Sequence, residues 1–120
     1  MAYRQRVGKW GEDQALAYLS SKGLCLIGRN VRTAHGEIDL IMADGEQLVF
    51  VEVKTRTSLD FGNPEESITS KKRARMVASV ESYLQKSPEN YQEWRIDVIA
   101  IYGMAGDSAP EIEWFENAVT

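Results

Sequence analysis

The sequence predicts a single α/β domain in which a central mixed β-sheet is flanked by helices, with elements in the order αβββαβ. Three observations favour this fold class. Two segments carry apolar residues at helical spacing, and the segments between and after them are short, apolar and rich in β-branched residues. The chain has 120 residues, the usual size of one domain, so residues 1–120 are expected to form one unit. Hydrophobic residues make up 43% and charged residues 27%, which indicates a globular, soluble protein.

The first helix is expected over residues 4–22, and Gly23 suits its C-terminal end. Its apolar stripe consists of Val7, Ala15, Leu16, Tyr18 and Leu19. A first strand should follow over residues 24–32, with a bend at Gly28.

Two further strands are predicted over residues 36–42 and 47–55, and the sequence ADGE between them is typical of a hairpin turn. A loop over residues 58–67 should lead to a second helix over residues 68–87. The rest of the chain is expected to form a strand, a turn and a last short strand or tail, over residues 94–102, 104–110 and 111–119.

Composition excludes several classes of site. One cysteine, Cys25, rules out an internal disulfide and fits a reducing cytoplasm. With His35 as the one histidine, a Cys/His zinc cluster is excluded as well. The sequence contains neither a Walker A loop nor a GxGxxG motif. Its apolar runs are far shorter than the roughly 20 residues of a membrane span, and its start lacks a signal-peptide core, so a cytoplasmic location is expected.

The segment LVFVEVKTR, residues 48–56, contains an acid and a base in an otherwise apolar strand. Such a run is typical of a central strand that is covered on both faces. Because side chains alternate along a strand, Glu52 and Lys54 leave the same face. The ordinary explanation would be an ion pair on an edge strand.

The register of the predicted hairpin decides how Asp39 lies relative to this pair. With a turn at residues 44–45, Asp39 would lie opposite Phe50 and diagonal to Glu52. With a four-residue loop, Asp39 would lie directly opposite Glu52. In both registers Asp39 shares a face with Glu52 and Lys54, within reach of one small ion, whereas an odd loop or a bulge would break the arrangement. The ordinary alternative is that Asp39 caps a backbone group or pairs with an arginine.

Glu12 is a third acid of interest. Its neighbours along the helix are apolar: Ala15, Leu16 and Leu19. Glu12 is therefore expected on the side that packs against the sheet, where a carboxylate needs a partner. A metal ion or a metal-bound water is one candidate, and a tyrosine hydroxyl is another. Glu37 has the same parity as Asp39 and could lie nearby.

Basic residues gather at the start of the second helix, at Lys71, Lys72, Arg73 and Arg75. They form either a solvated face or a surface on which a phosphate docks. Further positive charge near the strands comes from Arg29, Arg32 and Arg56. The formal net charge of −4 does not decide between these alternatives, because acids gathered around a metal would lower it without preventing contact with DNA elsewhere.

Taken together, these residues resemble a known family. Asp39 followed by Glu52-Val53-Lys54, with a helical glutamate upstream, resembles the PD-(D/E)xK nuclease superfamily of restriction-endonuclease-like fold. The order and spacing of five segments are similar to those of the small bacterial YraN-type proteins, which are related to archaeal Holliday-junction resolvases: GKWGEDQALAYL, RNVRTAHGEIDLI, LVFVEVKTR, FGNPEESITSKK and RIDVIAI. The sequence departs from that family at Trp114, where the family usually has a histidine in its last strand.

The resemblance implies a metal-dependent endonuclease that hydrolyses phosphodiester bonds in DNA, with branched or junction DNA as a candidate substrate. Mg²⁺ or Mn²⁺ would be held by Asp39, Glu52 and the carbonyl of Val53. Lys54 would contact the attacking water or the scissile phosphate, and Glu12 would hold a further water or a second ion. A protein that keeps the fold and binds nucleic acid without turnover is the alternative.

The partner implied is nucleic acid, with DNA first and no membrane, and a homodimer is left open. The residues expected to contact nucleic acid are Arg29, Arg32, Arg56, Lys71, Lys72 and Arg75.

Overall fold

The computed structural model describes residues 3–56, 69–87, 93–104, 106 and 108–119. Its elements are α1 (Tyr3–Ser21), β1 (Cys25–Thr33), β2 (Gly36–Asp44), β3 (Gln47–Arg56), α2 (Ser70–Lys86), β4 (Glu93–Tyr102) and β5 (Glu111–Val119). The predicted order is confirmed, and the C-terminal segment is a strand rather than a tail. The loop expected over residues 58–67 lies outside the described residues.

The five strands form one mixed sheet in the order β1-β2-β3-β4-β5. β3 and β4 are parallel, whereas the other neighbouring strands are antiparallel. A parallel pair cannot be joined by a tight turn, and α2 lies in the connection between these two strands. The expected bend at Gly28 is confirmed as a shift in register between Leu26 and Gly28, where β1 pairs with β2.

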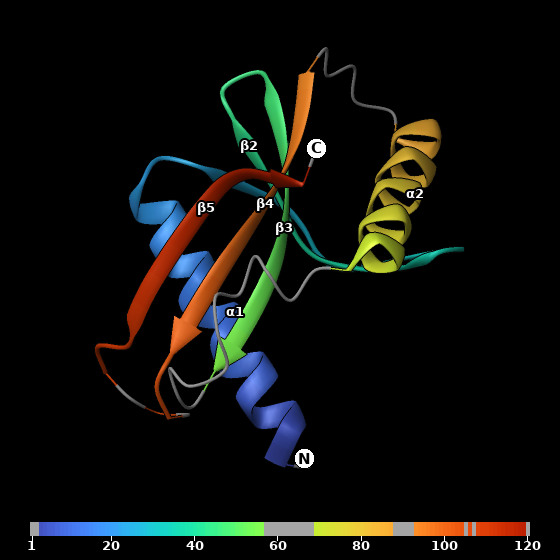
Figure 1. The fold of residues 1–120 in the computed structure, drawn as a ribbon. Coiled ribbons are helices and arrows are strands. Elements are labelled where there is room, and N and C mark those ends of the chain that lie inside the picture. The colour runs from blue at the N-terminus through green and yellow to red at the C-terminus, as the bar shows by residue number, and fades with distance from the viewer. Residues whose placement is uncertain (1–2, 57–68, 88–92, 105, 107, 120) are drawn as a thin grey trace.

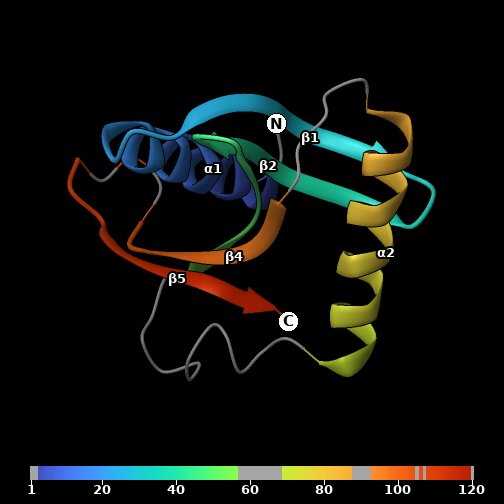
Figure 2. The same cartoon turned by 90° about the horizontal axis from the view of Figure 1, so that it is seen from above.

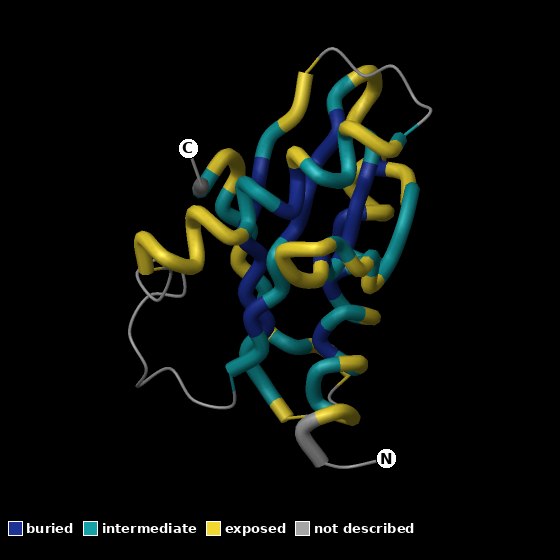
Figure 3. Tube along the Cα trace, turned by 90° about the vertical axis from the view of Figure 1, so that its right-hand side faces the viewer, coloured by how far each residue is buried: buried dark blue, intermediate teal, exposed yellow. Residues whose placement is uncertain are grey.

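The two helices cover opposite faces of the sheet (Figure 1, Figure 2). Under α1 the buried cluster is made by Ala15, Leu19, Leu24, Leu40, Met42, Val49, Val51, Ile99 and Ile101. Under α2 it is made by Ile38, Ile41, Leu48, Phe50, Val80, Ile96 and Val98. In Figure 3 the buried segments run along the strands in the middle of the molecule. β3 contributes to both clusters, so it is a central strand with two covered faces, as its apolar sequence predicts.

Neither described helix is long and apolar enough to cross a membrane.

Candidate active site

The hairpin of β2 and β3 brings Asp39 opposite Glu52. The strands pair from the turn as far as Leu40 and Val51, so the next position on each strand is Asp39 and Glu52. This is the register expected for a four-residue loop, although the turn consists of residues 45–46 alone. Glycine at position 45 has φ +63, which allows so short a turn.

At Asp39 the side chains of β2 stop alternating regularly between the two faces of the sheet. Leu40 packs under α1, whereas Ile38, two residues away, packs under α2. The N–H of Val53 lies beyond the end of the β2–β3 ladder and donates a hydrogen bond to Asp39 Oδ2 over 2.9 Å. Asp39 therefore caps a backbone group, as the ordinary alternative anticipated, while it also stands beside the acid of β3.

Glu52 and Lys54 form an ion pair on the face of β3 that is covered by α2. Lys54 Nζ lies 3.3 Å from Glu52 Oε1, and Lys54 is only 8% exposed. Because β3 pairs with β2 on one side and β4 on the other, the explanation by an edge strand is wrong. The Glu52 side chain is 24% exposed, so the pair joins a buried ammonium group to a carboxylate that is open to the solvent on one side.

The carboxyl group of Asp39 is electrostatically uncompensated. Burial raises the pKa of Asp39 from 3.8 to about 7, and repulsion by Glu52 adds to the rise. The hydrogen bond from Val53 opposes this rise in pKa, while Glu12 and Glu37 reinforce it. The pKa of Asp39 is thus affected both by Glu12 on α1 and by Glu37 on β2. A group in this state is stabilised by any cation that approaches it.

Glu12 reaches this region because α1 packs very closely on β3. A Cβ atom added to Gly11 would collide with the side chain of Thr55, so the helix rests directly on the strand. The Glu12 side chain is 17% exposed, as expected for the edge of the packed side, and its Oε1 lies 3.6 Å from Arg29 Nε. Its ion-pair partner is thus Arg29 rather than a tyrosine. Arg29 also lies 2.7 Å from Asp13, on the next position of the helix.

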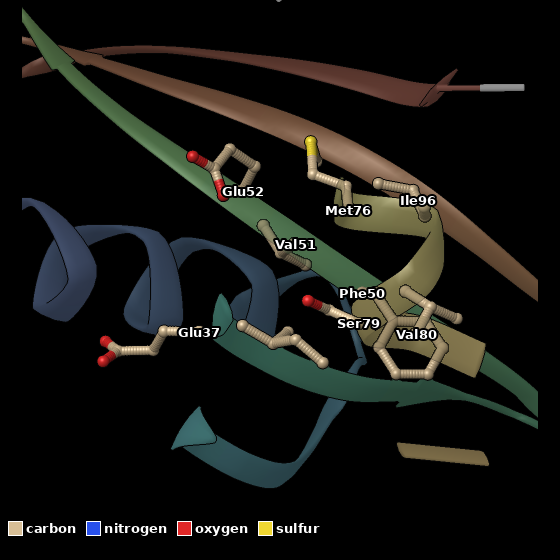
Figure 4. Close-up of a pocket in the computed structure, with 9 residues that line it drawn as sticks. Glu37, Phe50, Val51, Glu52, Met76, Ser79, Val80 and Ile96 are labelled. Carbon is tan, nitrogen blue, oxygen red and sulfur yellow. The ribbon is translucent and has the colours of Figure 1, made fainter. Parts of the chain in front are cut away.

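A pocket of about 170 Å³ lies beside Glu52, between α2 and the connection from β1 to β2. Its polar lining consists of His35, Glu37, Glu52, Lys72, Arg75 and Ser79. A smaller cavity of about 20 Å³, enough for a water molecule, adjoins it and shares Glu37 and Glu52. Figure 4 shows the two acids at one end of this cavity, with Phe50 and Ile96 at its other end. Acidic and apolar surfaces therefore meet under the N-terminal half of α2.

The cations expected to bind nucleic acid occupy different surroundings. Arg29 is engaged by the acids of α1, and Arg32 is 89% exposed with its Nε 3.8 Å from Glu37. Arg56 is half-buried and donates to the carbonyl of Thr55 over 3.3 Å. Their contact with nucleic acid stays a prediction.

The basic run at the start of α2 is divided by the rotation of the helix. The hydroxyl of Thr69 caps the helix and accepts a hydrogen bond from the backbone N–H of Lys72 over 3.2 Å. Lys72 and Arg75 line the pocket beside Glu52, whereas Lys71 is exposed outside it.

The sequence alone does not distinguish Lys72 from its basic neighbours. The side chain of Lys72 contacts Lys54, which lowers the pKa of Lys72, and burial adds to the lowering while Glu52 opposes it. The signal was present in the spacing, because Lys72, Met76 and Ser79 stand at positions i, i+4 and i+7 of one helix face. Ser79 is buried and Met76 is partly buried, so that face looks toward the sheet.

The donor set fits a hard divalent cation in its chemistry. Asp39 and Glu52 offer carboxylate oxygens, the ligands that Mg²⁺ prefers, and the raised pKa of Asp39 marks a charge that lacks a cation. Within the described part of the chain, no three His, Cys, Asp or Glu side chains converge closely enough to hold a metal by themselves. An ion here would therefore rely on two carboxylates, the carbonyl of Val53 and water, which suits Mg²⁺ because it keeps several waters.

Trp114, which departs from the resembled family, has a structural role on the other face of the sheet. Its Nε1 donates to Asp97 Oδ2 over 2.9 Å, and the backbone N–H of Asn117 donates to Asp97 Oδ1 over 2.8 Å. Asp97 is fully buried and is also bound by Arg95 Nε, 3.0 Å from Oδ1. This group fills the β4–β5 bulge and does not join Glu52 and Lys54.

Comparison with known proteins places the chain among bacterial relatives. Residues 11–101 match the model of "Uncharacterised protein family UPF0102". The chain is 45% identical to the UPF0102 protein of Herminiimonas arsenicoxydans over 118 residues, which cover 97% of this chain and 88% of that protein. It is 41% identical to the UPF0102 protein of Dehalococcoides mccartyi over 120 residues, which cover 99% of this chain and 98% of that protein. The chain therefore belongs to the UPF0102 family.

Proposed function

We propose that this protein is a metal-dependent endonuclease of PD-(D/E)xK type that hydrolyses phosphodiester bonds in DNA. The observation that carries the proposal is the meeting of Asp39 and Glu52 beside Lys54 at the end of a central hairpin. The resemblance to YraN-type and Holliday-junction-resolving proteins supports the same assignment and favours branched or junction DNA.

Each residue of the site has a distinct role in this proposal. When bound, Mg²⁺ or Mn²⁺ would neutralise the carboxylates and stabilise the charge that develops on the reacting phosphate. Lys54, held by Glu52 in a poorly hydrated place, presents its ammonium group to a phosphate oxygen. Asp39 fixes the end of the hairpin through Val53, so its second oxygen has a defined position.

Glu12 adds negative charge to the site from α1. Its pairing with Arg29 limits the directions that its carboxylate takes. In the proposed reaction Glu12 orients a water molecule beside the carboxylates of the two strands.

A binding protein without turnover is the second candidate. The absence of a three-acid cluster among the described residues favours it, because two carboxylates bind a divalent ion less tightly than three. Both candidates place nucleic acid over the same pocket.

A cleavage screen tests the proposal. Purified protein is incubated with a four-way junction, a flap, single-stranded DNA, duplex DNA and RNA in Mg²⁺ or Mn²⁺. Protein carrying Asp39→Asn and Glu52→Gln, purified in parallel, controls for contaminating nucleases. We expect cleavage by the wild type alone. Binding without cleavage of every substrate would favour the second candidate.

A further inference from the structure

Lys71 and Lys72 are neighbours in sequence and have different surroundings. Lys72 lines the pocket beside Glu52, and its interaction with Lys54 of the central strand lowers the pKa of Lys72. Both lysines are exposed, but Lys71 takes no part in that lining. A general basic surface would use both residues alike, so the difference points to a specific task for Lys72.

Lys72 and Lys54 carry like charges and interact, since Lys54 lowers the pKa of Lys72. Lys54 is balanced by Glu52 at 3.3 Å, whereas Lys72 forms no ion pair with an acid in the part of the chain that the structure describes. Two ammonium groups in contact repel, and one carboxylate balances only one of them. An anion placed between them would relieve this repulsion and accept charge-assisted hydrogen bonds from both.

A second cation of α2 lines the same pocket. Arg75 lies three residues after Lys72 on the same helix face, a separation of about 5–6 Å between Cβ atoms. Arg75 makes no ion pair among the described residues, and His35 of the β1–β2 connection lines the same pocket. The pocket therefore offers two cationic positions about one helical turn apart, in a lining that also contains Glu37 and Glu52.

The wall that carries His35 is held in place by hydrogen bonds. Ser79 Oγ of α2 lies 3.1 Å from Thr33 Oγ1, and the Thr33 hydroxyl donates to the carbonyl of Gly36 over 2.9 Å. The backbone N–H of His35 donates to the same hydroxyl over 3.1 Å. Because these bonds tie the connection to the helix, the pocket exists before a ligand arrives, which lowers the cost of binding.

We propose that Lys72 and Arg75 form a subsite for two consecutive phosphates of a nucleic-acid strand. Lys72, together with Lys54, binds the phosphate that lies at Glu52, and Arg75 with His35 binds the next phosphate along the strand. This inference rests on the proposed nuclease function and deepens it, because it makes Lys72 a residue of the site itself. It also requires a substrate that carries a second phosphate beside the reacting one.

The test compares variants of the two adjacent lysines. The probe is a thymidine tetranucleotide, with inorganic phosphate as a second, smaller probe. Affinity is measured by titration in Ca²⁺, and the lysine side-chain signals are followed by NMR. We expect Lys72→Ala to weaken tetranucleotide binding about tenfold, Lys72→Arg to keep most of it, and Lys71→Ala to change it less than twofold. Arg75→Ala should weaken binding of the tetranucleotide and leave phosphate binding unchanged.

The outcomes separate this inference from the nuclease proposal. Equal losses in Lys71→Ala and Lys72→Ala would overturn the subsite, even where the wild type cleaves DNA. A loss confined to Lys72→Ala supports the subsite, even where no substrate is cleaved and the nuclease proposal fails. A wild type that binds neither probe, with unmoved lysine signals, also overturns it.

Discussion

The backbone N–H of Val53 donates a hydrogen bond to Asp39 Oδ2 over 2.9 Å, just beyond the end of the β2–β3 ladder. One acid thus completes the sheet and faces Glu52 across the hairpin. The dual task explains why Asp39 is buried without a cation, which is the origin of its raised pKa. The hydrogen bond that holds the end of the hairpin and the raised pKa therefore belong to the same carboxyl group.

Without metal, Asp39 should make stability depend on pH. The folded state holds the Asp39 pKa at about 7 against 3.8, so below about pH 4 both states are protonated and no penalty exists. Between pH 4 and 7 the unfolded chain loses the proton first, so the free energy of unfolding falls as pH rises. We expect Asp39→Asn to remove a loss on the order of 2–4 kcal/mol. Chemical denaturation in EDTA at several pH values measures it, and parallel curves for both proteins would contradict the burial described here.

A divalent cation should stabilise the wild type. Mg²⁺ or Mn²⁺ relieves repulsion between Asp39 and Glu52, and binding to the folded state alone raises the melting temperature by mass action. Calorimetry on the wild type and on the variant with Asp39→Ala and Glu52→Ala measures both heat of binding and melting. Equal binding by the two proteins would remove the metal site from this position.

Substitution of Glu12 should separate charge from fold. Glu12→Gln keeps the shape and breaks a partly exposed pair with Arg29, so stability should change by less than about 1 kcal/mol. Cleavage should fall sharply because the third carboxylate is lost. Asp13→Asn is the matched control: it breaks the shorter pair with the same arginine but should leave activity unchanged. Similar rates for the two variants would show that Glu12 acts only through Arg29.

Removal of the central lysine should abolish cleavage and spare binding. Lys54→Ala takes away one transition-state contact, a change that commonly costs about 100-fold or more in rate. Affinity for a long oligonucleotide should stay within a few-fold, because Lys72, Arg75 and other exposed cations such as Arg32 still bind the strand. A gel assay in Mg²⁺ reads cleavage, and a filter assay in Ca²⁺ at several salt concentrations reads binding. Cleavage that persists in this variant would refute the mechanism proposed above.

The central part of the site could be predicted from sequence because it depends on local geometry. Alternation along β3 fixes Glu52 and Lys54 on one face, and the two registers considered for the hairpin both brought Asp39 near them. The exact register was not predictable, since it depends on which of several turn residues closes the hairpin. The interrupted alternation of side chains at Asp39 was not predictable either, because it follows from the packing of Ile38 under α2.

Contacts between distant elements could not be predicted in this way. Arg29 finds Glu12 through the packing of β1 beside α1, and no local pattern links positions 12 and 29. Trp114 reaches Asp97 only because β5 bulges beside β4. Lys72 is an intermediate case. Its spacing along the helix is visible in the sequence, but its nearness to Lys54 depends on how α2 crosses the sheet.

Gly11 allows α1 to pack directly against Thr55 of β3. Because position 11 has no side chain, the side chain of Thr55 occupies the place that a Cβ atom would take. A methyl group at position 11 would collide with Thr55, so we expect Gly11→Ala to push the helix outward. Glu12 would then move away from Asp39, although no charged residue has been changed. The position of the third carboxylate therefore depends on a neighbouring residue that has no side chain and takes no part in the chemistry.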